Sequence, residues 1–247
     1  MKPWLSGPFM PDRAEVKKLL MTISSSDTHF IKLIHWSDSS NIFLVEYKGQ
    51  ERILKVFHEN EDRGMADDGR RDLDRYRSEA RAYVNLKKSG LCDRGIVPKL
   101  YGFIESLDPK SFERELHSFL RDKHFPNAIL LEYLPGASSM NYSKYSEGRM
   151  NIAIESIQQI HELAFVQHLD TYTKNILLVP GPPERVLWTD FDITVSFKDR
   201  SELTAEDKES MDFELEIVKS LGELLAEDHK LGWPKESRGF GESVHRM

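Results

Sequence analysis

The apolar residues of this chain change their spacing part-way along, and this change limits the possible folds more than any other feature. In the first half, β-branched and aromatic residues gather in short runs typical of strands. Five such runs lie near residues 30–35, 42–47, 52–57, 96–104 and 128–134, and the turn at 48–50 separates the second from the third. One helical pattern follows the third run, from Asp72 to a stop at Gly90. This order predicts an antiparallel meander with one helix after its third strand.

The charged stretch 59–71 has no apolar period and is interpreted as a solvated loop. The polar segment between the fourth and fifth runs holds a short predicted helix over 112–120. Pro135 and Gly136 open the best candidate linker, at 135–139. The linker divides the chain into a predicted N-lobe over 1–134 and a C-lobe over 135–247.

Helical spacing dominates the second part. A helix is predicted over 147–165 with Ser146 as its N-cap, and another over 206–228, where Thr204 and Asp207 form a capping-box-like start. Gly232 and Pro234 are the predicted stops of the last helix. The fold class is therefore α+β, with a five-stranded antiparallel sheet and one helix in the first lobe and a short, mainly helical second lobe.

The clearest chemical pattern lies between the two helices of the second lobe. Asp170 follows His168 by two positions, Asn175 follows five residues later, and the apolar run 176–179 comes next. Asp190 appears fifteen residues after Asn175, again between apolar residues. Carboxylate and amide oxygens on turns beside strands suit a Mg²⁺ site next to a nucleophilic hydroxyl. We interpret His168 as a structural histidine bonded to the backbone.

The spacing H-x-D-x-x-x-x-N followed by D-F resembles the catalytic core of the protein kinases. Lys55, in the apolar run 53–57, resembles the strand lysine of that family, and Glu79 follows it by 24 residues on the predicted helix. The run 129–134 resembles the last strand and hinge of the N-lobe, with Leu131 guarding the back of a nucleotide pocket. The resemblance thus covers both lobes and implies a bilobal protein-kinase-like fold.

The resemblance also implies a role for each matching residue. Asp170 is the expected base toward a substrate hydroxyl, and Lys174 is expected to supply a charge beside the γ-phosphate. Mg²⁺ is expected on Asn175 and Asp190. The remaining residues are expected to hold ATP. They are the strand lysine, the helix glutamate that orients it, two residues of the hinge backbone and two hydroxyls of the first hairpin: Lys55, Glu79, Glu132, Leu134, Ser39 and Ser40.

Several positions depart from the family pattern. The loop 36–41 has no glycine, so its backbone is not expected to approach phosphates closely, although its serine hydroxyls can donate hydrogen bonds. Leu169 replaces the arginine of H-R-D, which argues against control by activation-loop phosphorylation. Asp192 replaces the glycine of D-F-G, no A-P-E follows, and 55 residues remain after Asp192.

Two classes of function remain open from the sequence. The first is an ATP- and Mg²⁺-dependent phosphotransferase acting on a hydroxyl of a protein or of a small molecule, since small-molecule kinases share the fold. The second is a pseudokinase that acts as a nucleotide-binding or scaffold module. The chain retains the four residues on which the chemistry depends, and this favours the enzyme: Lys55, Asp170, Asn175 and Asp190. The missing glycines and the altered D-F-G favour the pseudokinase.

Composition limits the classes of partner and the cellular location that we expect. The net charge of −7 is not that of a general nucleic-acid binder. Cys92 is the single cysteine, which excludes an internal disulfide. No signal peptide or run of about 20 apolar residues is present, so the expected location is intracellular, in the cytoplasm or nucleus, without a membrane partner. Substrate, regulatory partner and oligomeric state are not determined by the sequence.

Overall fold

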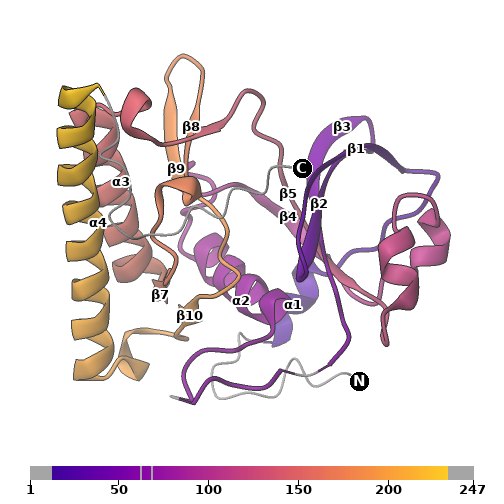
Figure 1. The fold of residues 1–247 in the computed structure, drawn as a ribbon. Helices are drawn as coiled ribbons and strands as arrows, with labels where there is room; N and C mark the ends of the chain where they lie inside the picture. Colours follow the sequence, from indigo (N-terminus) through magenta and orange to yellow (C-terminus); the bar gives the residue numbers. More distant parts are fainter. Residues whose placement is uncertain (1–12, 62, 68, 233–247) are drawn as a thin grey trace.

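A computed structural model describes residues 13–61, 63–67 and 69–232, and within these ranges the protein is a mixed α+β structure. Figure 1 shows a twisted sheet on one side of the molecule and a pair of long helices on the other. The five strands of the sheet are antiparallel, in the order β1-β2-β3-β5-β4. Their bounds are Thr28–Trp36 (β1), Ser40–Tyr47 (β2), Gln50–Phe57 (β3), Leu100–Ile104 (β4) and Asn127–Glu132 (β5).

The five predicted strands and their antiparallel arrangement are confirmed, but the fourth is shorter than predicted. It begins at Leu100 rather than near residue 96. Pro98 has no backbone N–H for a strand ladder. The Ile96 carbonyl instead accepts a hydrogen bond of 3.1 Å from the Trp188 N–H, in the second half of the chain. The segment before β4 therefore joins the two halves instead of extending the sheet.

Helix α2 (Arg75–Lys88) follows β3, as the pattern predicted, but it begins three residues later than Asp72. Asp74 is the N-cap, and its carboxylate accepts a hydrogen bond of 2.9 Å from the Arg77 N–H. Asp72 is buried and pairs with the guanidinium groups of Arg77 and Arg81 at 2.8 and 2.7 Å. An N-cap carboxylate satisfies a first-turn N–H group, which fixes where the helix starts.

The segment between β4 and β5 differs from the predicted single helix at 112–120. It forms two 3₁₀ helices, η2 (Pro109–Phe112) and η3 (His117–Arg121), seen in pink at the sheet side of Figure 1. Their apolar side chains cover one face of the sheet, here named the outer face. The buried residues of this layer are Phe43, Val45, Leu54, Val56, Ile104, Leu107, Phe112, Leu116, Phe119, Ala128 and Leu130.

The second half contains helix α3 (Glu147–Gln159), capped by Ser146 as predicted, and helix α4 (Ala205–Leu231), where the predicted capping box of Thr204 and Asp207 is present. The predicted single helix over 147–165 changes at Ile160 into a π-helical turn that ends at Phe165. Gly232 ends α4 as predicted, and Pro234 lies outside the described residues. The two helices pack side by side at the far left of Figure 1.

The second half is less purely helical than predicted because short strands join its loops. β6 (Ser138–Ser139), β8 (Ile176–Val179) and β9 (Arg185–Trp188) form one small sheet, and β7 (Val166–Gln167) pairs with β10 (Val195–Ser196). The predicted linker 135–139 thus ends in a strand. A further helix, α1 (Arg13–Leu19), precedes β1. None of the helices in the described ranges combines the length and apolar composition needed to cross a bilayer.

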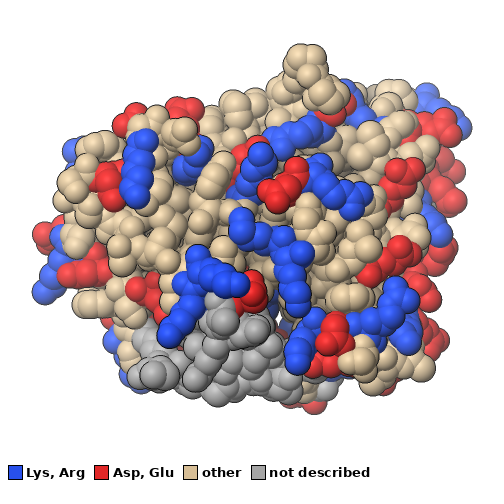
Figure 2. All heavy atoms as spheres, turned by 180° about the vertical axis from the view of Figure 1, so that it is seen from behind, with Lys and Arg blue, Asp and Glu red and all other residues tan. Residues whose placement is uncertain are grey.

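Charge is distributed unevenly over the surface. Figure 2 shows Lys and Arg side chains gathered across the middle of the face opposite to that of Figure 1, with Asp and Glu more frequent toward one edge. The net charge of −7 therefore describes the chain as a whole and not each of its faces.

Candidate functional site

Lys55 is the centre of a buried ionic cluster that joins three distant parts of the chain. Its side-chain nitrogen Nζ lies 2.6 Å from Glu79 Oε2 and 2.6 Å from Asp190 Oδ1, with Asp192 Oδ2 at 3.7 Å. Asp192 is also paired with Arg75, at 3.2 Å. Three of the residues predicted to act together (Lys55, Glu79 and Asp190) are therefore in direct contact.

The sheet explains why Lys55 points inward. In the register of β3 and β5, Lys55 is opposite Ile129 and Ile53 is opposite Leu131. Alternate residues of a strand share a face, so these four side chains lie on the face opposite to the outer layer. Lys55 is only 4% exposed, and α2 carries Glu79 against it with 1% exposure. The buried strand holds the ammonium group at a defined place.

The charges in this cluster shift one another's pKa values. Burial and the neighbouring carboxylates raise the pKa of Glu79 to about 7, although Lys55 opposes this shift. Burial also raises the pKa of Asp192. At Asp190, the attraction of Lys55 outweighs burial and lowers the pKa. Three carboxyl groups thus compete for one ammonium group, and Asp190 keeps its negative charge most readily.

The catalytic-loop candidate, residues 168–175, is folded around its own hydrogen bonds. Asn175 Nδ2 donates to the Asp170 carbonyl at 2.8 Å, which turns the amide oxygen away from that carbonyl. Lys174 Nζ lies 3.0 Å from Asp170 Oδ2. The Asp170 side chain is 12% exposed and that of Lys174 is 63% exposed, so the carboxylate is at the edge of the interior.

His168 has the structural role that we inferred for it. Its ring is fully buried between Trp188 and Phe191, and Nε2 lies 3.0 Å from the Thr189 carbonyl. Burial lowers its pKa, so the neutral ring is favoured. The contact with Thr189 ties the loop to the residue that precedes Asp190, and this brings the predicted base and the predicted metal ligand into one site.

Glu214 is a site residue that the sequence analysis missed. This buried carboxylate of α4 accepts hydrogen bonds from the N–H groups of His168 (2.9 Å) and Leu169 (2.6 Å), and His161 Nε2 lies 2.6 Å from it. Leu169 has a φ of +62°, a left-handed conformation that is costly for a bulky residue. The carboxylate therefore holds a strained loop in place. Its position on the buried face of α4, with Met211 and Val218, was the available signal.

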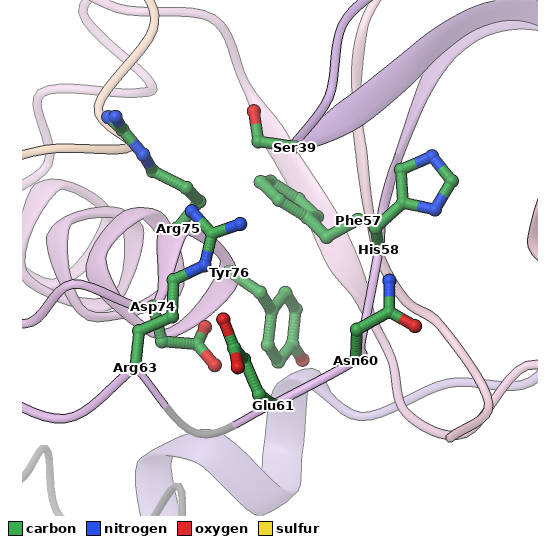
Figure 3. Close-up of a pocket in the computed structure, with 9 residues that line it drawn as sticks. All are labelled: Ser39, Phe57, His58, Asn60, Glu61, Arg63, Asp74, Arg75 and Tyr76. Carbon is green, nitrogen blue, oxygen red and sulfur yellow. The ribbon is translucent and has the colours of Figure 1, made fainter. Parts of the chain in front are cut away.

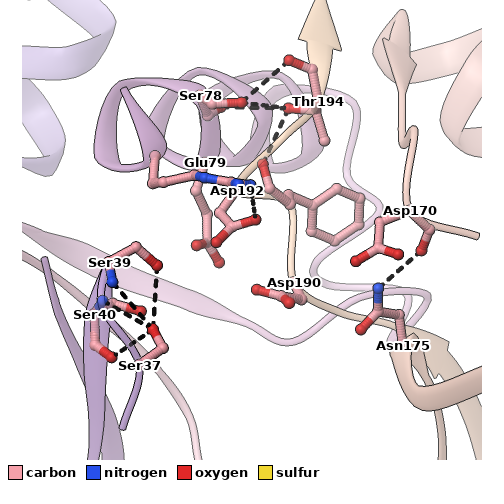
Figure 4. A network of polar contacts seen from close by, with 12 residues as sticks. Ser37, Ser39, Ser40, Ser78, Glu79, Asp170, Asn175, Asp190, Asp192 and Thr194 are labelled. Carbon is pink, nitrogen blue, oxygen red and sulfur yellow. Dashed lines mark hydrogen bonds and ion pairs between the residues drawn. The ribbon is translucent and has the colours of Figure 1, made fainter. Parts of the chain in front are cut away.

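The first hairpin, whose Ser39 and Ser40 hydroxyls are predicted to bind phosphate, folds into a compact serine turn, and that role stays a prediction. The N–H groups of Ser39 and Ser40 both donate to Ser37 Oγ, at 3.3 and 3.1 Å, and that hydroxyl bonds the Ser40 carbonyl at 3.0 Å. Ser40 is buried, at 4% exposure. Figure 4 shows this serine turn on one side of Asp190, with Asp170 and Asn175 on the other. The turn faces the ionic cluster, but its backbone donors are already engaged within the turn.

A small cavity of about 50 Å³ adjoins the serine turn. Figure 3 shows its walls, which come from the turn, the end of β3 and the start of α2. The Arg63 side chain reaches toward the space, whereas Arg75 extends away from it. The lining residues are Ser39, Phe57, His58, Asn60, Glu61, Arg63, Asp74, Arg75 and Tyr76.

The two residues predicted for the hinge lie at the end of β5 and just after it. The Glu132 N–H donates to the Lys99 carbonyl at 2.9 Å, and its carboxylate pairs with Arg185 at 2.8 Å. Leu134 is buried and its carbonyl accepts from the Ala137 N–H at 3.1 Å. Neither residue contacts the Lys55 cluster through any hydrogen bond or ion pair of the described residues. Their predicted role toward an adenine ring stays a prediction.

The oxygen donors available for a cation are the Asp190 carboxylate and the Asn175 amide. In the described ranges, no three His, Cys, Asp or Glu side chains converge as a ready-made metal site. Mg²⁺ commonly uses one or two protein oxygens and completes its shell with phosphates and water, so the donor set fits this ion when phosphates accompany it.

No protein-family model matches the chain, and no curated protein matches its sequence.

Proposed function

We propose that this protein is an ATP- and Mg²⁺-dependent phosphotransferase with a bilobal, protein-kinase-like arrangement, acting on a hydroxyl group. Two ion pairs of Lys55 support this proposal most. Lys55 lies 2.6 Å from Glu79 and 2.6 Å from Asp190, which are 24 and 135 residues away in the chain. Asp190 is in turn coupled to the Asp170–Asn175 loop through Thr189. One lysine thus brings together a helix carboxylate and a metal-type carboxylate beside a candidate base.

The residues present fit a nucleotide with a divalent cation. Lys55 offers a buried cation for phosphate oxygens, and Asp190 with Asn175 offers the oxygen ligands for Mg²⁺. When bound, ATP would supply the phosphoryl group, and Mg²⁺ would neutralise the charge of the phosphates during transfer. On the Lys55 face Ile53 is half-buried and Ile129 and Leu131 are buried, so the wall on which a base ring would lie is apolar.

The protein contributes positioning and one proton transfer. The Asp170 carboxylate would accept the proton of the attacking hydroxyl as the new P–O bond forms and the bond from the γ-phosphorus to the bridging oxygen breaks, with ADP as the leaving group. Asn175 and Glu214 hold the loop that carries Asp170, from within the loop and from α4. Lys174, 3.0 Å from Asp170, places a mobile positive charge where the transferred group gains negative charge. The acceptor is a hydroxyl of either a protein or a small molecule.

One observation favours the second candidate, a catalytically weak or inactive nucleotide-binding module. Ser37 occupies the N–H groups of Ser39 and Ser40, and these are the donors that a phosphate-binding hairpin would otherwise use. Asp192 also adds a carboxylate near Lys55. Both features weaken phosphate binding, whereas neither removes Asp170, Asn175 or Asp190.

Nucleotide binding and turnover separate these candidates. We expect Mg²⁺-ATP to raise the melting temperature, since a ligand at a hundred times its Kd adds about 2.7 kcal/mol of stability. Asp170→Asn is expected to abolish ATP turnover and keep binding, and Asp190→Ala is expected to lose the Mg²⁺-dependent part of binding. Asp212→Asn, on the exposed side of α4, is the matched control. Binding without turnover in the wild type supports the second candidate, and absence of binding at millimolar Mg²⁺-ATP refutes both.

A further inference from the structure

The two edges of the five-stranded sheet are treated differently. At the β4 edge, the Met21 N–H donates to the Phe103 carbonyl at 2.8 Å and Leu20 forms a parallel bridge with Phe103. β1 forms the other edge, and in the described part of the chain no strand pairs with its free side. An open edge is a template for another strand, and proteins usually cover or shorten it. Within the described ranges the free side of the nine-residue β1 has no partner strand, and the strand carries register shifts between Phe30 and Lys32 and between Leu33 and His35.

Large apolar side chains are exposed along this open strand. Ile31, Leu33, Ile34 and Trp36 are 49, 48, 46 and 66% exposed. Scattered single apolar residues on a surface need no explanation, but these four lie within six positions of one edge strand. The register places Leu33 and Trp36 on the outer face, and Ile31 and Ile34 lie at its two register shifts. The edge therefore offers both unpaired backbone groups and apolar contact area.

A groove of about 620 Å³ adjoins the C-terminal end of β1 on the outer face, a volume typical of ligand-binding sites. Leu33 is opposite Phe43 in the register with β2, so it lies on the outer face, away from Lys55. The opposite wall comes from η3 and the residues beside it. The lining residues are Leu33, Trp36, Ser37, Asp38, Asn41, Phe43, His58, Asn60, Glu115, His117, Ser118 and Asp122.

The groove has an acidic character. Its lining includes Asp38, Glu115 and Asp122 but no Lys or Arg. His58 and Asn60 engage Asp122, at 2.9 and 3.2 Å. Asp38 is an exposed carboxylate at the rim, and Glu115 is a half-buried one. A basic side chain entering this groove would meet carboxylates on two sides and an indole ring, a favourable setting for a cation.

Self-pairing of this edge is disfavoured by its own sequence. Lys32 is the central residue of β1, so the two-fold antiparallel pairing that uses the whole strand would place the two Lys32 side chains opposite each other. Like charges directly opposite across a strand pair are destabilising. A different strand with a neutral or acidic residue at that position would avoid this repulsion.

We propose that β1 and the adjoining groove form a docking surface for an extended segment of a partner protein, which adds as a sixth strand. Backbone hydrogen bonds to the open edge provide affinity, and side-chain pockets provide the choice of sequence. The partner segment carries alternating apolar residues, which cover Ile31, Leu33 and Trp36, and a Lys or Arg that enters the groove beside Glu115. The groove is on the face of the sheet opposite to Lys55, so its occupancy does not depend on phosphoryl transfer.

A phage-displayed library of random 12-residue peptides, selected on the full chain, tests this proposal. We expect enrichment of peptides with alternating apolar residues and at least one Lys or Arg. A synthetic enriched peptide is then titrated by fluorescence anisotropy. Trp36→Ser and Glu115→Lys are expected to raise its Kd at least tenfold and fivefold. Ile152→Ser, at an exposed apolar site on α3 (44%), is expected to leave it unchanged. N-methylation of the peptide's alternate N–H groups should weaken binding at least tenfold for one set only.

Three results would overturn the proposal. The first is a selection that enriches no peptide of this pattern. The second is a peptide whose affinity is the same for the wild type and for both surface variants, with thermal melts confirming that each variant is folded. The third is a wild-type dimer in sedimentation experiments that Trp36→Ser converts to monomer, because the edge is then covered by a second copy.

Discussion

Replacement of Glu79 by glutamine is expected to change how stability depends on pH. Glu79 is 1% exposed, and its pKa is raised from 4.5 to about 7 by burial and by its neighbouring carboxylates. A raised carboxyl pKa contributes stability that is complete below the unfolded-state value and is lost as the pH rises through the folded-state value. The free energy of unfolding of the wild type therefore falls between about pH 4.5 and pH 7.

The size of this loss follows from the two pKa values. A difference between 4.5 and about 7 corresponds to about 3 kcal/mol, at about 1.4 kcal/mol per pH unit. Glutamine has the shape of the protonated acid and does not titrate. We expect Glu79→Gln to match the wild type near pH 4, to be more stable by about 1 kcal/mol at pH 5, and to be more stable by about 3 kcal/mol at pH 8.

Urea denaturation at pH 5, 6, 7 and 8 measures this difference. Glu216→Gln is the matched control, because Glu216 is 66% exposed and forms a surface pair with Lys219. Its difference from the wild type should be small and constant. Parallel pH profiles of the wild type and Glu79→Gln would refute the reasoning, since they would mean that Glu79 stays ionised throughout. Under the proposed function, Glu79→Gln also lowers turnover, because Lys55 loses a charged partner.

Three other changes have defined expected outcomes. Glu214→Ala leaves one buried and one part-buried loop N–H group without their acceptor. It should cost about 1–4 kcal/mol in urea denaturation and abolish phosphotransfer activity. Gly222→Ala places a Cβ 2.8 Å from Met150 Cγ and should lower the melting temperature, whereas Gly148→Ala, with open space around it, should leave it equal or raise it. Thr204→Ala removes the α4 cap and should cost about 1 kcal/mol, and an unchanged melting temperature would contradict its capping role.

The sequence predicted the ionic cluster because each member is marked by its local pattern. Lys55 is flanked by apolar residues on a strand, Glu79 is one turn into a helix, and Asp190 follows an apolar strand. Strand alternation and helix caps depend on neighbours in the sequence, and these predictions were confirmed in most elements. The prediction of a strand at 96–99 was wrong because Pro98 has no N–H for the strand ladder and the Ile96 carbonyl accepts a hydrogen bond from Trp188.

The parts that could not be predicted depend on contacts between distant residues. Glu214 is one of several carboxylates on α4, and only the packing of α4 against the loop selects it. The sequence shows that the serine turn is polar. It does not show that the Ser37 hydroxyl accepts hydrogen bonds from the N–H groups of Ser39 and Ser40. The short 3₁₀ helices of the insertion have no strong period, and their position on the sheet is decided by tertiary packing.

The insertion between β4 and β5 has a consequence for movement in this protein. Because η2 and η3 cover the outer face with residues such as Phe112 and Phe119, the second half of β3 (54–57) is buried and Lys55 is attached to a stiff support. Any opening or closing around the ionic cluster must then be carried by α2 and by the segment of Asp190, which has a φ of +66°. In hydrogen-exchange experiments, β3 should behave as the slow, stationary part of the molecule, and the other two elements as those that move relative to it.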